Sequence, residues 1–593
     1  MEKKKKLIIF ALLLSVSAVL LFFYSGSAPL KFVRLKFSID KGKTQADQNL
    51  SSSGFVDIKY SAGEELFLRP GVKGERGLIL DLSATSDKWP DGRITIDVMR
   101  EGAPILRKVL LFKKRNLNFT LSERMAFQKN DLLRIGTKGS GRLIVKDPVL
   151  YRINDPKKKN YIFVIGLDNL RFDKIGKKVN GVEITPNLNR LMEDSVTFTN
   201  GYSQSSWTLP AFTSLFTGLN EFNHGITRDT YLKKNIDLLT DNFAKKFVTV
   251  SINGGVWLGP KTTGYRGFDV FKLGSRTKDV NASEKFFNNA IDFLRNNDIP
   301  DLFMFMHTFA IHAPYFPPEK FLLKLKKNPA YKFLKAFTHD RQYKSDVPEK
   351  IREYSSLLYE ADIFAFDHFF GKFLNYLKQE GIYERSLIVF LSDHGEEFYE
   401  HKGWFHGHSH YDEMIKIPLI IKFPGNKYSG KKIGDLVGLI DVLPTLSEYL
   451  GIKTDQKIDG VSLLPLVEGG IIEERTLVSS TTICRINDRS PQAIALLRGR
   501  FKYIHNIDNV NRKGKKLVWE AVLKRGDNEL YDLNSDPGEL HNLIIEKPVI
   551  TEKFKRDMIL ILKKVKENFN SGKVKRGKLS ESEKEKLKTL GYL

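Results

Sequence analysis

Two short apolar runs in this chain each end on acidic residues. Residues 161–167 are YIFVIGL and run into Asp168, and residues 387–391 are LIVFL and run through Ser392 into Asp393 and His394. Such runs, rich in β-branched and aromatic residues, are typical of strands buried on both faces of a parallel sheet. Ligands of open α/β sheets bind beyond the carboxyl ends of the strands. We therefore expect Asp168, Asp393 and His394 to close on one divalent metal ion, although a lone acid at a strand end is often a helix cap or turn residue.

A hydroxyl-rich segment, residues 205–210 (SSWTLP), lies between these two runs. Pro210 favours a helix start and Gly218 favours its end. A hydroxyl at a helix N-terminus lies where a phosphate or sulfate group also binds well. Thr208 is therefore a candidate nucleophile, and the alternative is that it only caps the helix.

Composition limits the partners that this chain can have. Its 593 residues are too many for one hydrophobic core, so we expect several domains. The net charge of +25, from 95 basic and 70 acidic residues, favours anionic partners such as acidic lipid headgroups, phosphate polymers or sulfated glycans. A lysine-rich solvated surface explains the charge equally well. No nucleic-acid-binding motif is present, so we expect no nucleic acid partner. The single cysteine, Cys484, excludes a disulfide framework and suits a bacterial envelope protein.

The N-terminus predicts a membrane anchor. Four lysines at 3–6 precede an apolar run of about 18 residues, 7–24, which is long enough to cross the bilayer as a helix. The lysines keep the N-terminus in the cytoplasm, so the rest of the chain lies outside it, on the periplasmic or extracellular face. Small residues at 25–28 leave a cleaved signal peptide as the alternative, in which case the protein is secreted.

Four regions follow from the patterning of the chain. We predict a signal anchor at 1–28, an antiparallel β-sandwich at 29–155, a large α/β domain at 156–470 and a C-terminal subdomain at 471–593. The second region has alternating runs separated by Gly, Pro, Asn and Asp. In the third, strand-like runs alternate with helical patterns. The fourth combines antiparallel strands with a charged helix from about residue 551.

The motifs from residue 160 onward resemble the sulfatase family of the alkaline-phosphatase superfamily. The similar segments, in the family's order, are VIGLDNLRFD (164–173), TPNLNRL (185–191), WTLPAFTSLFTG (207–218), SDHGEE (392–397), HGHSHYDE (406–413), IDVLPT (440–445), DGVSLLP (459–465) and DPGELHN (536–542). The resemblance implies a doubly wound sheet with a small C-terminal antiparallel sheet. It also implies ester cleavage through a covalent enzyme intermediate. Residues 29–155 lie outside it.

The resemblance also assigns the metal site and the nucleophile. It puts the nucleophile at Thr208 and the metal ligands at Asp168, Asp393 and His394, with Thr208 as the fourth. This donor set suits one Mn²⁺, Zn²⁺ or Mg²⁺ ion. Asn169 stands where many sulfatases carry a second aspartate, so Ca²⁺ fits less well, although an amide oxygen could still contribute.

Three histidines are implied in substrate binding. His312 would contact the ester oxyanion, and His406 and His408 lie near the position of a substrate-binding lysine in many sulfatases. Either of these two could bind the non-bridging oxygens or protonate the leaving oxygen. A solvated histidine-rich loop at 401–410 is the alternative.

This chain differs from arylsulfatases at two positions, and these differences favour phosphoester over sulfuric-ester chemistry. Arylsulfatases carry Cys or Ser at the nucleophile position, oxidised to formylglycine, whereas this chain has Thr208, and Phe212 replaces an arginine. Branches with an unmodified threonine transfer phosphoethanolamine or phosphoglycerol to envelope polymers. We therefore expect a phosphoester or phosphodiester hydrolase or transferase acting on a phospholipid headgroup or phosphorylated glycan. The alternatives are a sulfuric-ester hydrolase acting on sulfated glycans and a catalytically inactive envelope binding protein.

Overall fold

The computed structural model describes residues 160–570, with gaps at 227–231, 233–234, 255–257, 259–266, 274–278, 298, 300, 326–347, 482–492 and 507–527. Between 32 and 151 it describes strands, with side chains at some of their positions. The predicted anchor at 7–24 lies outside the described residues. None of the helices within the described ranges has the length and apolar character needed to cross a membrane. The chain divides mainly after Lys159 into two compact units.

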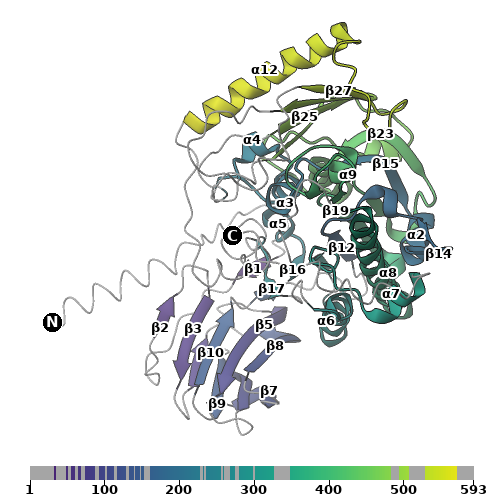
Figure 1. Ribbon diagram of the computed structural model, residues 1–593. Coiled ribbons are helices and arrows are strands. Elements are labelled where there is room, and N and C mark those ends of the chain that lie inside the picture. The colour runs from purple at the N-terminus through teal and green to yellow at the C-terminus, as the bar shows by residue number, and fades with distance from the viewer. Residues whose placement is uncertain are drawn as a thin grey trace, which may run out of the picture. The chain divides into compact units, whose positions relative to one another are not determined.

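The larger unit is built on an eight-stranded mixed sheet (Figure 1). In spatial order its strands are β17 (Val270–Leu273), β16 (Val248–Asn253), β18 (Asp301–Thr308), β12 (Asn160–Leu167), β19 (Ser386–Ser392), β22 (Leu419–Lys422), β15 (Val196–Tyr202) and β23 (Lys432–Gly438). The apolar runs at 161–167 and 387–391 lie in β12 and β19, which pair in parallel. β22 runs antiparallel to both of its neighbours, so the sheet is mixed. This confirms the predicted α/β class.

Helices cover both faces of the sheet. Phe163 and Gly166 are three positions apart in β12, so they point to opposite faces. Phe163 makes an edge contact with Phe373 of α8 (Glu349–Gln379), with ring centroids 5.8 Å apart. Gly166 faces α3 (Thr208–Thr217), where an added Cβ would lie 2.8 Å from the Phe212 ring. The glycine therefore lets α3, which begins at the candidate nucleophile, approach the strand closely.

The C-terminal subdomain is a four-stranded antiparallel sheet with a helix. Its strand order is β24 (Leu477–Thr481), β25 (Ala493–Arg498), β26 (Phe501–Asn506) and β27 (Glu529–Asp532). The last described helix, α12 (Pro548–Asn570), buries Phe554 and Met558 against Leu496 and Tyr503 of this sheet. The helix starts three residues before the predicted position because Pro548 suits a first helical turn.

The smaller unit contains two antiparallel sheets. One has the path β1 (Phe32–Arg34), β11 (Val149–Tyr151), β5 (Gly74–Ser86), β10 (Gly141–Lys146), β3 (Phe55–Tyr60) and β2 (Gln48–Leu50), with β8 (Asn116–Phe127) also paired to β5. The other has the order β4 (Glu65–Leu68), β9 (Leu132–Lys138), β6 (Arg93–Arg100) and β7 (Ala103–Leu111). In β6, the buried Asp97 binds Arg107 and Arg134 on the two neighbouring strands. These cross-strand ion pairs hold the pKa of the Asp97 carboxyl below its usual value despite burial, which alone would raise it.

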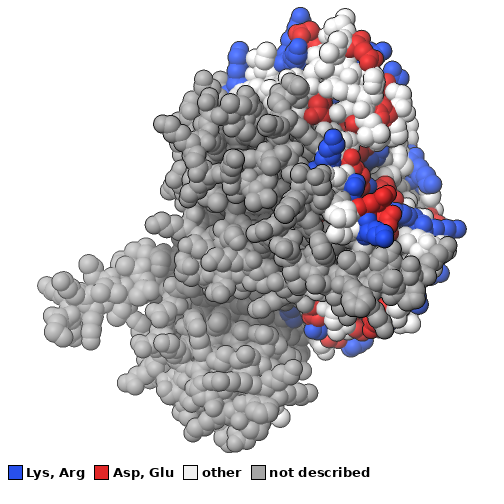
Figure 2. Space-filling view, in the orientation of Figure 1, with Lys and Arg blue, Asp and Glu red and all other residues white. Residues whose placement is uncertain are grey.

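Charged side chains are mixed over the surface that can be seen. On the face shown in Figure 2, basic and acidic side chains of described residues alternate rather than separate. The charge excess is therefore not gathered into a single basic patch on the described part of that face.

Candidate active site

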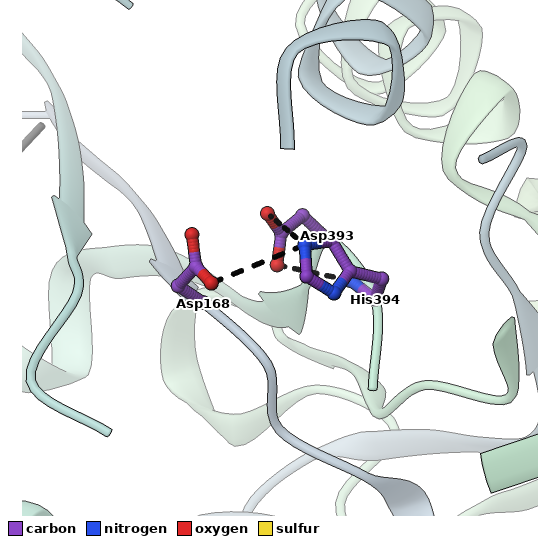
Figure 3. Close-up of side chains that lie close together, drawn as sticks. All are labelled: Asp168, Asp393 and His394. Atoms are coloured by element: carbon purple, nitrogen blue, oxygen red, sulfur yellow. Dashed lines mark hydrogen bonds and ion pairs between the residues drawn. The ribbon is translucent and has the colours of Figure 1, made fainter. Parts of the chain in front are cut away.

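The ends of β12 and β19 bring the predicted metal ligands together (Figure 3). Leu167 pairs with Ser392, so the residues that follow each strand leave the sheet side by side. Asp168, Asp393 and His394 then offer ligand atoms that all lie within 4.8 Å of one another, and all three side chains are fully buried. His394 Nε2 is 3.4 Å from Asp393 Oδ2 and 3.9 Å from Asp168 Oδ1. The side chains thus converge on one point, as a metal centre requires.

Buried oxygen atoms at this point fit a cation. Asp168 Oδ1, Asp393 Oδ2 and Asn169 Oδ1 are buried and accept no hydrogen bond from any described residue. Buried polar atoms normally have partners, so such atoms call for an explanation. Carboxylate and amide oxygens with one imidazole are ligands that Mn²⁺, Zn²⁺ and Mg²⁺ accept. The residues present therefore fit one divalent ion, with Asn169 able to add an oxygen.

The electrostatics of the cluster lead to the same conclusion. Burial raises the pKa of Asp168, and burial together with the nearby Asp168 raises the pKa of Asp393 to about 6. Burial lowers the pKa of His394, but the two carboxylates outweigh it and raise the pKa overall. A divalent ion would place further positive charge beside these two buried carboxylates.

Thr208 lies against this cluster at the first residue of α3. Its Oγ1 donates to Asp168 Oδ2 at 3.1 Å and lies 3.4 Å from His394 Nε2. The N-cap residue is Trp207, so Thr208 is already inside the helix and its side chain is not the cap. Gly218 ends the helix in the left-handed conformation, at φ 65°, as the sequence predicts. The Thr208 hydroxyl is therefore buried beside the candidate metal ligands and close to the positive end of the helix dipole.

His307 is a neighbour of this cluster that the sequence did not identify. It lies in β18, and its Nε2 is 3.6 Å from Asp168 Oδ2, while its Nδ1 contacts Asn253 at 3.1 Å. Burial lowers the pKa of His307 to about 4, so the ring is neutral near pH 7. The signal available in the sequence was its position near the end of an apolar run, which resembles that of Asp168.

His312 and His406 line the same site. The His406 ring lies 4.4 Å from the His394 ring and 5.1 Å from the His312 ring, between centroids. Burial lowers the pKa of His312 to about 3, and its Nδ1 donates to the carbonyl of Ala313 at 2.5 Å. The structure thus brings two of the three predicted substrate-binding histidines beside the candidate metal ligands.

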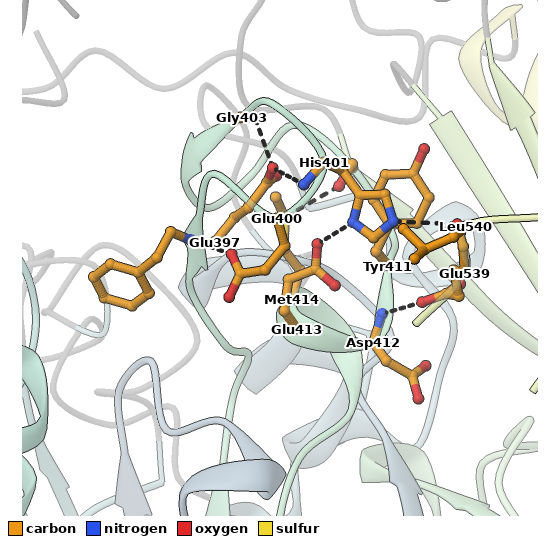
Figure 4. A network of polar contacts seen from close by, with 12 residues as sticks. Glu397, Glu400, His401, Gly403, Tyr411, Asp412, Glu413, Met414, Glu539 and Leu540 are labelled. Atoms are coloured by element: carbon orange, nitrogen blue, oxygen red, sulfur yellow. Dashed lines mark hydrogen bonds and ion pairs between the residues drawn. The ribbon is translucent and has the colours of Figure 1, made fainter. Parts of the chain in front are cut away.

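His408 lies in a different environment. Its Nε2 is 2.8 Å from Glu397 Oε2. Glu397 also accepts the backbone N–H groups of His401 and Gly403, at 2.9 and 2.6 Å (Figure 4). The structure therefore groups His408 with the polar network of its loop.

That network ties the histidine loop, residues 401–410, to the C-terminal subdomain. His401 stacks on Tyr411 with ring centroids 3.6 Å apart, and its ring nitrogens contact Glu413 and the Glu539 carbonyl (Figure 4). Lys502 of β26 is fully buried and binds both Asp412 and Glu539. The C-terminal subdomain thus supports the loop that carries His406.

A buried acid to which the sequence motifs assign no role, Glu396, links several residues of the site. Its Oε2 accepts from Asn169 Nδ2 at 2.6 Å and from the Tyr315 hydroxyl at 2.9 Å, and its Oε1 lies 2.9 Å from His406 Nδ1. Burial raises the pKa of Glu396 to about 8, although the Tyr315 hydrogen bond lowers it. Its neighbour Arg171 binds Asp173, Glu400 and the Glu396 carbonyl, which fits a structural role.

Comparisons with known proteins identify related sequences. The family described as Sulfatase matches residues 159–452, and the family described as N-sulphoglucosamine sulphohydrolase, C-terminal, matches residues 400–567. An arylsulfatase of Clostridium perfringens is 22% identical over 65% of this chain and 90% of its own length. An ulvan-active sulfatase of Formosa agariphila is 25% identical over 69% of this chain and 80% of its own.

Solved structures share the fold. The phosphonate monoester hydrolase of Agrobacterium radiobacter aligns with a TM-score of 0.55 at 20% identity, over 69% of this chain and 96% of its own. A structure in complex with its substrate D-glucosamine-2-N,6-O-disulfate aligns with a TM-score of 0.53 at 19% identity, over 70% of this chain and 99% of its own. At these identities the likeness concerns the fold alone.

Proposed function

Because this chain belongs to the sulfatase family of the alkaline-phosphatase superfamily, and is an ester-cleaving enzyme of that superfamily, we propose that it acts on phosphoesters or phosphodiesters through a covalent intermediate on Thr208. One observation carries the proposal: the buried Thr208 Oγ1 lies 3.1 Å from Asp168 and 3.4 Å from His394. A threonine cannot become formylglycine, so an unmodified hydroxyl must be the attacking group.

The residues of the site have separate roles in this reaction. Asp168, Asp393, His394 and Thr208 would hold one divalent ion, with Asn169 as a further oxygen donor. Such an ion supplies Lewis-acid chemistry, which lowers the pKa of the Thr208 hydroxyl and stabilises charge on the ester. Thr208 Oγ then forms a bond to phosphorus as the bond to the leaving oxygen breaks. His312 binds non-bridging oxygens, and an anionic ester favours the protonated form of its ring.

The second half of the reaction releases the group from Thr208. Water attacks phosphorus in a hydrolase, and an acceptor hydroxyl attacks in a transferase. His406, whose ring lies beside the rings of His394 and His312, is the residue we assign to proton transfer, and His408 is the alternative.

The predicted anchor suggests where the reaction takes place. Residues 3–24 would place the catalytic unit outside the cytoplasm of a bacterial cell, beside envelope lipids and polymers. We therefore propose phospholipid headgroups or phosphorylated glycans as the substrate class.

Sulfuric-ester hydrolysis is the second candidate, and the names of the relatives favour it. An arylsulfatase and an ulvan-active sulfatase align over about two thirds of this chain. If this chain shares their chemistry, sulfated glycans are its substrates and Thr208 attacks sulfur without modification.

One experiment separates the two candidates. The full chain in detergent is supplied with Mn²⁺, Zn²⁺ or Mg²⁺ and with nitrophenyl phosphodiester, phosphomonoester and sulfate substrates. We expect phosphodiester turnover that Thr208→Ala lowers by at least about 10³-fold, and a trapped phosphate on the Thr208 peptide in mass spectrometry. Turnover of sulfate alone would favour the second candidate, and phosphodiester turnover that survives in Thr208→Ala would contradict the nucleophile.

A further inference from the structure

Two neighbouring acids each bind a histidine ring nitrogen. Glu396 Oε1 contacts His406 Nδ1 at 2.9 Å, and Glu397 Oε2 contacts His408 Nε2 at 2.8 Å. All four residues are buried or nearly so, with side-chain exposure of 5% or less. The first of these pairs borders the candidate metal ligands, because the His406 ring lies 4.4 Å from the His394 ring.

The contact at Nδ1 determines how the His406 ring is turned. The two ring nitrogens lie on either side of Cε1, so anchoring Nδ1 on Glu396 points Nε2 away from that carboxyl group. The ring sits between His312 and His394, and His394 Nε2 is itself 3.4 Å from Thr208 Oγ1. His406 is therefore held beside the residues that surround the Thr208 hydroxyl.

Glu396 is itself held firmly. Its Oε2 accepts from Asn169 and from Tyr315, which belong to separate segments of the chain. Its backbone N–H donates to the Glu413 carbonyl at 2.9 Å. The preceding Gly395 packs so closely that an added Cβ would overlap the Glu413 carbonyl oxygen. A carboxyl group that is fixed at one oxygen and at its backbone can set the orientation of a partner at its other oxygen.

We propose that Glu396 is a positioning residue that orients His406, through Nδ1, as the proton donor to the leaving oxygen. The inference rests on the proposed function and deepens it, since it assigns the acid of the same site. In such an arrangement an acidic side chain orients a histidine whose second nitrogen exchanges the proton.

His406 gives a proton in the first step of the reaction and regains one in the second. The Thr208 proton is lost to solvent before attack. As the Thr208 Oγ–P bond forms and the P–O bond to the leaving group breaks, the proton on His406 Nε2 passes to the leaving oxygen. In the second step His406 takes a proton from the attacking water or acceptor hydroxyl, and the Thr208 oxygen leaves phosphorus.

The test compares leaving groups in Glu396→Gln and in a matched variant, Glu397→Gln, which alters the neighbouring acid–histidine pair. Methyl 4-nitrophenyl phosphate has a good leaving group, and methyl phenyl phosphate has a poorer one that needs protonation. In Glu396→Gln we expect kcat for the phenyl ester to fall by about 10²-fold, kcat for the nitrophenyl ester to fall by less than about 10-fold, and KM to change little. In Glu397→Gln the ratio of the two rates should stay at its wild-type value.

Two results would overturn the proposal. One is an equal loss on both esters in Glu396→Gln, since a merely structural role slows both alike. The other is a changed ratio in Glu397→Gln, which would make His408 the proton donor. Bound metal, measured by elemental analysis, is compared in each variant.

A measurement without turnover separates this inference from the proposed function. In protein labelled with ¹⁵N-histidine, the His406 ring signals, assigned with His406→Gln, should shift in Glu396→Gln and stay unchanged in Glu397→Gln. If wild-type protein cleaves only sulfates, the proposed function fails, and the same leaving-group comparison is made with aryl sulfates. Unshifted His406 signals in Glu396→Gln would overturn the positioning role whichever ester is cleaved.

Discussion

Thr208 Oγ1 lies 3.1 Å from Asp168 Oδ2, although one residue begins a helix and the other follows a strand 40 positions earlier. The contact exists because α3 packs closely on β12, where Gly166 leaves room for Phe212. The glycine in β12 thus lets the Thr208 hydroxyl reach the carboxylate of Asp168, which lies beside that of Asp393.

Metal binding should stabilise the protein. A cation between the carboxylates of Asp168 and Asp393 favours the folded state, so we expect Mn²⁺ or Zn²⁺ at about 100 times the dissociation constant to add about 2.7 kcal/mol. The measurement is the melting temperature after chelation and after metal is restored. In Asp393→Asn the metal-dependent rise should shrink strongly, whereas Glu397→Gln should keep it. An equal rise in Asp393→Asn and in wild type would contradict the assignment of this ligand.

Asp367 should make stability depend on pH. This residue of α8 accepts backbone N–H groups of Asn187 and Leu188 at 3.0 and 2.8 Å, in the first turn of α2 (Pro186–Glu193). Burial raises its pKa from 3.8 to about 6, although these hydrogen bonds lower it. The folded protein therefore keeps this proton to a higher pH than the unfolded chain does. The contribution of the protonated Asp367 carboxyl to the stability of the fold is therefore complete below about pH 4, and it is lost as pH rises through about 6.

Asp367→Asn tests this pH dependence, since the amide does not titrate. We expect wild type to lose stability relative to Asp367→Asn between pH 4 and pH 7, by up to roughly 3 kcal/mol. Melting temperatures of both proteins at pH 4, 5.5 and 7 measure the difference. A constant difference across this range would show that the carboxyl group does not titrate there.

Gly395→Ala should destabilise the site loop. A Cβ at this position would overlap the carbonyl oxygen of Glu413, a backbone atom that cannot move cheaply. We expect a loss of about 1–3 kcal/mol, seen as a lower melting temperature, together with weaker metal binding. The control is Gly434→Ala, where a Cβ would meet only Thr199 Oγ1 at 3.9 Å, and its stability should stay within about 0.5 kcal/mol of wild type. Equal melting temperatures for the two variants would refute the close contact.

The N-terminal run should bind the chain to membranes. We expect the full chain to remain in the membrane fraction after carbonate washing, because residues 7–24 are uncharged and about long enough to span the bilayer. A chain that starts at residue 29 should be released. Mass spectrometry of the N-terminus of the mature protein checks the alternative, since a new terminus near residue 28 would indicate a cleaved signal peptide.

Local pattern in the sequence was enough to predict the strand ends and the helix start. The runs at 161–167 and 387–391 form neighbouring strands, and the expected helix begins at Thr208 and ends at Gly218. The strands can be predicted because a strand buried on both faces of a sheet requires an unbroken apolar run. The helix ends can be predicted because proline and glycine have backbone preferences of their own. The resemblance of the motifs to the sulfatase family then assigned roles to the site residues in their order along the chain.

The sequence alone determined which side chains could bind a metal ion and which hydroxyl could attack. The candidate metal ligands follow strands and Thr208 begins a helix, and both kinds of element have patterns that are local in the sequence. Only the tertiary structure decided which histidine joins them. Glu396 and Glu397 are adjacent, yet they hold His406 and His408 in different surroundings. That choice depends on contacts from Asn169, Tyr315 and the C-terminal sheet, which are distant in sequence and meet only when the core packs.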